Sequence, residues 1–160
     1  MMLARLTAAM LPMVVFSWAA LAELDPIADL AGYWSGTGSV SLGSGKTERV
    51  KCSVIYKAEG SQLRQSMRCA SADYSINAQA DLHVTKSGQV SGSWEERTYS
   101  AKGDVTGRFA GESFNLKIQG ANFTAAMSVT LSSCKQSLSI MPQGLEVTKV
   151  SISLAKERCG

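Results

Sequence analysis

A strict alternation of apolar and polar side chains is the feature that most limits what this chain can fold into. Over residues 74–85 every second side chain is apolar, and those between are polar without a break. Shorter runs with the same period cover 62–69, 123–131 and 150–154. Side chains on a β-strand point alternately to opposite faces, so this period indicates strands with one buried face. Half-buried strands are typical of antiparallel sheets, and the chain is therefore predicted to be all-β and antiparallel.

Turn signals rich in Gly, Ser and Asn separate these runs. They lie at 43–45, 60–61, 86–88, 102–104, 120–122 and 143–144. The intervals predict about eight or nine strands, with some merging among 33–42, 47–58, 62–70, 74–85, 89–99, 104–110, 113–119, 123–132, 136–141 and 146–156. We expect one up-and-down meander that closes into a barrel, with a β-sandwich as the alternative, because both hide strand edges. Before the first strand, only residues 26–30 suit a short helical turn, with Asp25 as its N-cap.

The cysteines can be paired from the register of one hairpin. A two-residue loop with Gly first suits a type II′ turn, and Gly60-Ser61 offers one. Centring the hairpin there places Cys52 opposite Cys69, on the inward side of both strands. We predict that disulfide in a non-hydrogen-bonded pair, where the side chains come closer together. Exclusion then leaves Cys134 with Cys159.

The first 22 residues have the pattern of a secretory signal peptide. Arg5 supplies the positive charge, an apolar run over residues 6–16 follows, and Ala20-Leu21-Ala22 forms the cleavage box. We predict cleavage after Ala22, a single mature domain over 23–160, and a periplasmic or secreted location. Export favours disulfides. No cysteine follows the cleavage site directly, so we expect no lipid anchor there.

Composition narrows the classes of partner. The formal net charge is +3, which is too small to indicate nucleic acid. No segment after residue 22 is long and apolar enough to predict a transmembrane helix. We therefore expect neither nucleic acid as a partner nor a transmembrane segment.

Catalysis is not indicated by any motif. The chain has one histidine, His83, on the polar side of its strand. A nucleophile–histidine pair needs that ring beside a serine, and a zinc site needs further His or free Cys ligands. We expect no enzymatic activity, no metal and no cofactor, and interpret His83 as a surface residue.

Several inward positions suggest a ligand site. Trp34, Gly36 and Gly38 share one face of the first predicted strand, and Gly92, Trp94 and Glu96 share one face of another. Glycines that face inward can leave space beside large aromatic rings, and an inward Glu96 can meet a polar head group. The competing interpretations are that the glycines mark bulges or corners of a filled barrel, and that Glu96 is a rim residue paired with Arg97 or another base. Glu95 points to the opposite face, so the two carboxylates form no catalytic pair.

A basic patch follows from the hairpin register. Lys57 lies opposite Arg64 on the outer face, with Lys51 and Arg68 nearby. The patch can bind an anion such as an envelope phosphate or an acidic polymer. The alternative is an ordinary solvated basic face, which Glu59 neutralises in part.

The opening of the mature chain resembles that of the calycin group. Gly32-Tyr33-Trp34 matches the G-x-W motif that starts the first strand of those barrels. The same stretch is similar to small periplasmic metalloprotease inhibitors of that group, through Leu30, Gly32 and Trp34 after a free arm over residues 23–28. The resemblance implies a calycin-like barrel in which Trp34 closes one end, and it implies nothing catalytic. The mature chain also resembles small exported bacterial proteins.

These observations favour an exported, non-catalytic binding protein. The first hypothesis is a carrier for an apolar or amphipathic envelope ligand, with Trp34 and Trp94 lining or closing the cavity. The second is a protease inhibitor that uses the arm at 23–28. The third is a structural envelope protein that binds anionic polymer or lipid head groups through its basic patch.

Overall fold

The computed structural model describes residues 27–159. The predicted signal peptide and its cleavage site lie outside the described residues, as do Asp25 and Pro26. A single turn of 3-10 helix, η1 (Ala28–Leu30), precedes ten strands. The strands are β1 (Gly32–Leu42), β2 (Thr47–Glu59), β3 (Gln62–Ala70), β4 (Ser75–Val84), β5 (Gln89–Glu96), β6 (Ala101–Ala110), β7 (Ser113–Gly120), β8 (Thr124–Ser132), β9 (Lys135–Gln143) and β10 (Val147–Lys156).

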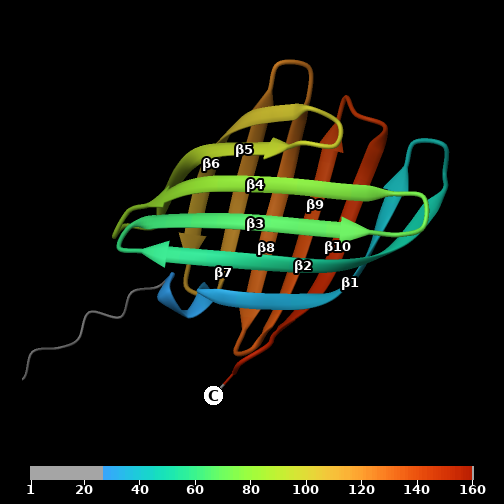
Figure 1. The fold of residues 1–160 in the computed structure, drawn as a ribbon. Helices are drawn as coiled ribbons and strands as arrows, with labels where there is room; N and C mark the ends of the chain where they lie inside the picture. The colour runs from blue at the N-terminus through green and yellow to red at the C-terminus, as the bar shows by residue number, and fades with distance from the viewer. Residues whose placement is uncertain (1–26, 160) are drawn as a thin grey trace, which may run out of the picture.

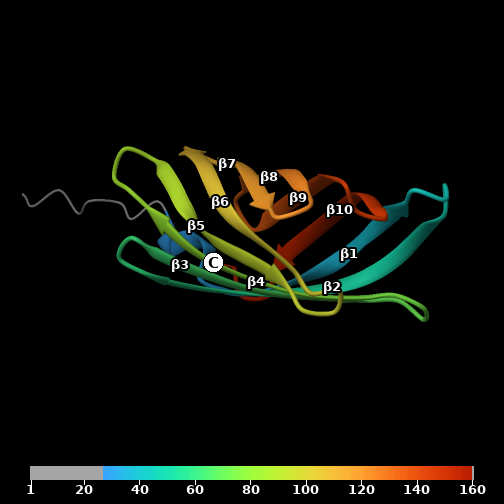
Figure 2. The ribbon, with the colours of Figure 1, turned by 90° about the horizontal axis from the view of Figure 1, so that it is seen from above.

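The ten strands form one closed antiparallel barrel. Each strand pairs with the next along the chain, and β1 pairs with β10 to close the sheet. Figure 1 shows β2, β3 and β4 running across the front of the molecule, with β8, β9 and β10 crossing behind them. Figure 2 shows these two layers from above. The predicted all-β meander is confirmed, and the ten ranges form separate strands rather than merging.

Alternation along the strands produces the core. On β4, the side chains of Ile76, Ala78, Ala80, Leu82 and Val84 are all buried, and those between them are not. The inward side chains of the strands together form a common apolar interior, and burial of that apolar surface supplies the main stabilisation. No helix among the described residues is long and apolar enough to cross a membrane.

The predicted hairpin register is confirmed. Cys52 pairs with Cys69 across β2 and β3, and Lys57 pairs with Arg64. The Cys52–Cys69 disulfide joins two inward side chains whose Cα atoms are 4.1 Å apart, close to the spacing of a non-hydrogen-bonded pair. The second predicted disulfide, Cys134–Cys159, ties the end of the chain to the β8–β9 turn.

One turn prediction is wrong. The Lys-Gly-Asp signal at 102–104 lies inside β6, and the chain reverses at 97–100 instead. Gly103 is needed there for space, because a Cβ would lie 2.8 Å from the Ile118 side chain and 2.9 Å from the Gln119 carbonyl oxygen. The strand predicted over 89–99 also ends early, at Glu96, because the Glu96 carboxylate accepts hydrogen bonds from the backbone of the loop that follows. The helical turn is also shorter than expected, and its N-cap residue is Ile27 rather than Asp25.

The inward glycines of β1 mark a corner of the barrel. A Cβ on Gly36 or Gly38 would collide with the backbone of β10, at the carbonyls of Ser153 and Ser151. These glycines let the two strands cross closely and open no cavity. The structure therefore favours the corner interpretation and corrects the expected cavity at these two positions.

Trp34 and η1 close one end of the barrel. The indole nitrogen of Trp34 donates a hydrogen bond of 2.8 Å to the Leu30 carbonyl, and the ring packs edge-on against Tyr56. Lys156 Nζ lies 5.7 Å from the centre of the indole ring and donates to the Asp29 carbonyl. In an up-and-down barrel alternate loops lie at opposite ends. The β1–β2, β3–β4, β5–β6, β7–β8 and β9–β10 loops therefore surround the other end, which we call the open end.

Candidate functional site

A pocket of about 160 Å³ lies at the open end, beneath the β3–β4, β5–β6 and β9–β10 loops. Apolar side chains from six strands, β3, β4, β5, β6, β9 and β10, line it. The residues that line it are Met67, Tyr74, Ile76, Trp94, Glu96, Tyr99, Ala101, Ile140, Pro142, Leu145, Glu146, Val147 and Val150. The pocket is therefore an apolar recess with a few polar groups, which is the usual composition of a small-ligand site.

Three aromatic rings form part of the wall. Trp94 is half-buried on β5 and packs edge-on against Phe123, with ring centres 6.1 Å apart. Tyr74 and Tyr99 come from two different loops and stack with their ring centres 5.5 Å apart. Tyr99 is 56% exposed, and Leu145 across the mouth is 39% exposed. The rim thus presents large apolar groups to solvent.

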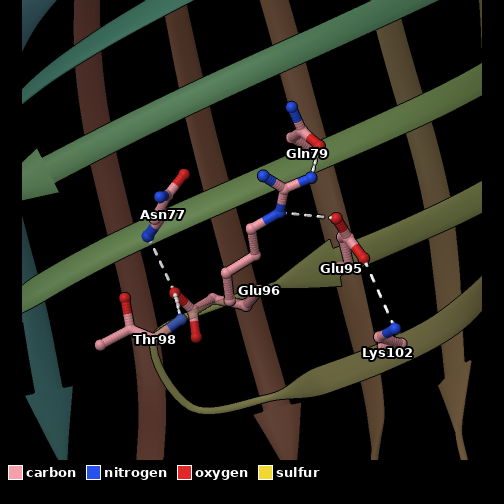
Figure 3. A network of polar contacts seen from close by, with 7 residues as sticks. Asn77, Gln79, Glu95, Glu96, Thr98 and Lys102 are labelled. Atoms are coloured by element: carbon pink, nitrogen blue, oxygen red, sulfur yellow. Dashed lines mark hydrogen bonds and ion pairs between the residues drawn. The ribbon is translucent and has the colours of Figure 1, made fainter.

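Glu96 is buried at the edge of the pocket and holds the β5–β6 loop. Its Oε1 accepts hydrogen bonds from the backbone N–H groups of Asn77 at 2.8 Å and Thr98 at 3.0 Å. Its Oε2 accepts one from the backbone N–H of Tyr99 at 2.7 Å. Figure 3 shows Glu96 reaching toward Asn77 on β4 and Thr98 on its own loop. The carboxylate therefore positions Tyr99 over the pocket.

Glu95 belongs to a separate network on the outer face. It forms an ion pair with Arg97 at 2.8 Å and another with Lys102 at 3.7 Å (Figure 3). The hydrogen bond from Arg97 holds the pKa of the Glu95 carboxyl below its usual value. The alternative interpretation of Glu96 as the partner of Arg97 is therefore corrected: Arg97 pairs with Glu95.

The electrostatic character of the pocket is acidic. Glu96 and Glu146 line it, and no described Lys, Arg or His does so. The pKa of the Tyr74 phenol is raised well above its ordinary value, first by burial and then by Tyr99, with the two glutamates adding to the effect. The charges of Glu96 and Glu146 therefore act on Tyr74 within the pocket.

The structure brings together only some of the predicted ligand residues. Trp94 and Glu96 line the same pocket, whereas Trp34 lies at the closed end, and Gly36 and Gly38 face the backbone of β10. Gly92 also meets neighbouring backbone, at Leu82. An inward direction on a strand is thus not enough to predict that a residue lines the pocket.

The interior near the closed end is closely packed around a small cavity. A cavity of about 20 Å³ remains beside a buried polar triad. The Gln65 amide donates to the Tyr56 hydroxyl at 2.9 Å, and that hydroxyl donates to the Gln136 side-chain oxygen at 3.1 Å. The Nε2 of Gln136 is buried without a hydrogen-bond partner among the described residues. Space of this size holds about one water molecule, which would satisfy that donor.

The predicted basic patch is divided by the structure. Arg64 pairs with Asp81 on β4 at 2.6 Å, which neutralises it and raises its pKa. Lys51 instead lines a groove of about 1050 Å³ on the outer face, together with Arg49 and Lys149. Lys57 remains opposite Arg64, and Arg68 lies opposite Asn77, both exposed.

The outer groove combines cations with hydroxyl groups. Most of its hydroxyls lie in cross-strand rows over β8, β9, β10 and β1, and these residues are Thr37, Ser39, Ser128, Thr130, Ser137, Ser139, Ser151 and Ser153. Ser71 adds one more from the β3–β4 loop. No described carboxylate lines it. Its composition is therefore opposite in charge to that of the pocket.

His83 is exposed on β4, where its Nδ1 lies 3.2 Å from the Gln62 side-chain amide. Over residues 27–159, no group of three or more His, Cys, Asp and Glu side chains is arranged to hold a metal ion.

Comparison with known proteins identifies the fold class. No family model and no curated protein sequence matches the chain significantly. The crystal structure of Rv2717c from M. tuberculosis aligns with a TM-score of 0.66 and 14% identity, over 82% of this chain and 95% of that one. The S-type phycobiliprotein lyase CPES from Guillardia theta aligns with a TM-score of 0.61 and 11% identity, over 82% and 90%. Identities this low establish a likeness of fold alone, and the predicted fold class, a closed antiparallel barrel, is confirmed by the strand pairing.

Several residues of the pocket were not predicted. Tyr74 begins the alternating run of β4, so its inward direction could have been read from the sequence. Tyr99, Leu145 and Glu146 lie in loops, where no periodicity indicates direction. Arg49 on β2 and Lys149 on β10 each alternate with inward residues. They reach the same groove because β1 pairs with both strands, and no local pattern predicts that pairing.

Proposed function

We propose that this chain is an exported, non-catalytic binding protein that holds a small apolar or amphipathic ligand in the pocket at the open end. The observation that carries the proposal is the pocket itself: an apolar recess at one end of the closed barrel, beneath three loops. Fixed polar groups at its edge can orient a ligand. The two disulfides are compatible with export.

The volume of the pocket limits the ligand. A cavity of about 150 Å³ can hold a benzene molecule. The pocket of about 160 Å³ therefore accepts a single ring or a short alkyl group. A larger ligand would bind with its apolar end inside and the rest outside, over Tyr99 and Leu145.

The first experiment tests occupancy. A native mass spectrum of the purified protein is expected to show a stoichiometric adduct that solvent extraction removes. Titration with toluene, followed by amide NMR, is expected to shift residues around Trp94 and Ile76.

Matched variants identify the site. Ala101 lines the pocket, and Ala126 is exposed on β8 away from it. The Ala101→Leu variant is expected to abolish binding because the added side chain fills the recess, whereas Ala126→Leu should bind as the original protein does. A bare mass together with no response to toluene would exclude the proposal.

A second candidate function is suggested by the outer groove. Its three cations form no ion pair among the described residues, and no carboxylate opposes them. We propose that an acidic polysaccharide can lie along this groove, with its anionic groups at Arg49, Lys51 and Lys149 and its hydroxyls at the serine rows. No aromatic residue lines the groove, which disfavours a neutral sugar held by ring stacking.

Binding of heparin, an acidic polysaccharide, can be compared with binding of dextran, a neutral one. Heparin is expected to bind with a steep salt dependence, whereas dextran should not. The triple variant Arg49→Gln/Lys51→Gln/Lys149→Gln should lose heparin binding. A triple variant with the same charge change elsewhere, Lys57→Gln/Arg68→Gln/Lys117→Gln, should retain it. Equal loss in both would show that only net charge matters, and the groove would then have no specific role.

The inhibitor hypothesis depends on an arm at 23–28. Residues 23–26 lie outside the described part of the chain, so that function is supported only by the sequence.

A further inference from the structure

We propose that the pocket at the open end selects ligands that carry a positively charged ammonium head on a small apolar body. The inference rests on the proposed function, because it names the ligand class of the same site. It is carried by three features of the pocket: its aromatic faces, its carboxylates and its size.

The aromatic faces are supplied by three separate elements. Trp94 comes from β5, Tyr74 from the β3–β4 loop and Tyr99 from the β5–β6 loop, and all three line the pocket. The negative face of an aromatic ring attracts an organic cation within about 6 Å, and sets of such rings bind methylated ammonium groups. A wall of this kind stabilises a cation as well as a neutral hydrocarbon.

Two carboxylates, those of Glu96 and Glu146, make the electrostatic potential of the pocket negative. Glu96 is 6% exposed and fixed by three backbone N–H groups, which compensate part of its charge. A carboxylate offers about four acceptor positions, so one position on Oε2 is not filled by these three donors, and the negative charge of Glu96 can act on a cationic head whether or not it carries an N–H. Glu146 is exposed at the mouth, and neither carboxylate forms an ion pair within residues 27–159. With no basic side chain among the described lining residues, the pocket attracts a cation and repels a carboxylate or phosphate head.

The raised pKa of Tyr74 also indicates that the pocket disfavours negative charge. Burial is the main cause of this raised pKa, and Glu96 and Glu146 add to it, so a further negative charge beside these two carboxylates is disfavoured. An anionic ligand head would meet the same repulsion, in addition to the cost of losing its water.

Three probes of similar size test the inference. Benzyltrimethylammonium carries the charged head, neopentylbenzene is its neutral carbon isostere, and benzoate is an anion. Each is titrated into the full chain, with binding followed by calorimetry and by NMR shifts around Trp94. We expect benzyltrimethylammonium to bind roughly tenfold more tightly than neopentylbenzene, and benzoate to bind most weakly.

Glu146→Gln is the variant of choice, because no described side-chain contact depends on it. It should reduce the affinity for benzyltrimethylammonium several-fold and leave that for neopentylbenzene unchanged. Glu112→Gln, at the closed end, is the matched control and should change neither affinity.

The outcomes separate the two proposals. Equal affinities for the charged and neutral probes would overturn the ammonium inference and leave the apolar pocket as proposed. Tightest binding of benzoate would also overturn it. If none of the three probes bound but toluene did, only the ammonium inference would fall; if toluene also failed to bind, both proposals would fall.

Discussion

Tyr56 shows how a single buried polar side chain is accommodated in this barrel. Its hydroxyl accepts from Gln65 and donates to Gln136, so both of its hydrogen-bonding roles are filled without water. Burial raises its pKa to about 12, although the two amides oppose the shift. The neutral phenol is thus part of the folded structure.

The Tyr56 shift predicts a loss of stability at high pH. The folded pKa lies above the unfolded value of 10.0, so the contribution is complete below pH 10 and is lost as the pH rises toward about 12. We expect the free energy of unfolding to fall over that interval. Tyrosinate absorbance should show late titrations from both Tyr56 and Tyr74, and the Tyr56→Phe variant should lose one of them. If the two proteins titrated identically, Tyr56 would not be buried as described.

Residues of this kind are only partly predictable. The alternation placed Gln65 on the inward side of β3, where a polar side chain is unexpected. Its partner Gln136 lies on β9, 80 positions from Tyr56 in the chain. The triad exists because the barrel brings β2, β3 and β9 around one interior, and local patterns carry no information about that meeting.

At the scale of elements, the β5–β6 hairpin shows how a reversal can be set by a side chain instead of by a glycine. The loop at 97–100 contains no glycine, and Ser100 adopts a positive φ of 55°. Three partly buried backbone N–H groups donate to the Glu96 carboxylate, which is their acceptor in place of water. β5 therefore ends at Glu96, whose carboxylate caps the backbone N–H groups of the loop.

Removing that carboxylate should loosen the hairpin. Glu96→Ala leaves three backbone donors without their acceptor, and we expect a loss of about 2–4 kcal/mol in the free energy of unfolding. Hydrogen exchange of the Thr98 and Tyr99 amides should quicken. Glu95→Ala, one position earlier on the outer face, removes only exposed ion pairs and should have a much smaller effect. Similar losses in both variants would contradict the capping role.

The hairpins differ in how well the sequence predicted them. The β2–β3 register and its disulfide follow from one turn and the period of two, because both are local. The β5–β6 turn was misplaced because Gly103 resembles a turn signal although it serves close contact with β7. Glycine can provide either a reversal or space, and only the neighbouring strand distinguishes them.

For the whole molecule, closure of the barrel depends on the crossing of β1 and β10. Nine residue pairs join the two strands, from Trp34–Lys156 to Leu42–Val147. Gly36 and Gly38 allow the close backbone approach at this corner. The tight corner lies apart from the pocket at the open end.

A methyl group at the corner should therefore destabilise the fold. Gly36→Ala places a Cβ against the Ser153 carbonyl, and we expect a loss of about 1–3 kcal/mol as β10 shifts away. Gly43→Ala is the matched control, because a Cβ there meets its nearest atom at an ordinary 3.6 Å. Denaturant unfolding of the two variants measures the difference. Equal stabilities would show that β1 and β10 can separate without cost.

By itself the sequence determined the class of strands, their approximate bounds, one hairpin register and both disulfides. These features depend on residues close in the chain or on a period that a pleated strand imposes. The choice between cavity and core was decided only by the tertiary structure. Trp34 and Trp94 both face inward, yet one is packed into the closed end and the other lines the pocket. Whether an inward position meets packed side chains, a neighbouring backbone or open space depends on how the two layers cross and where the loops fold over them, and those distances are set by contacts between residues far apart in the chain.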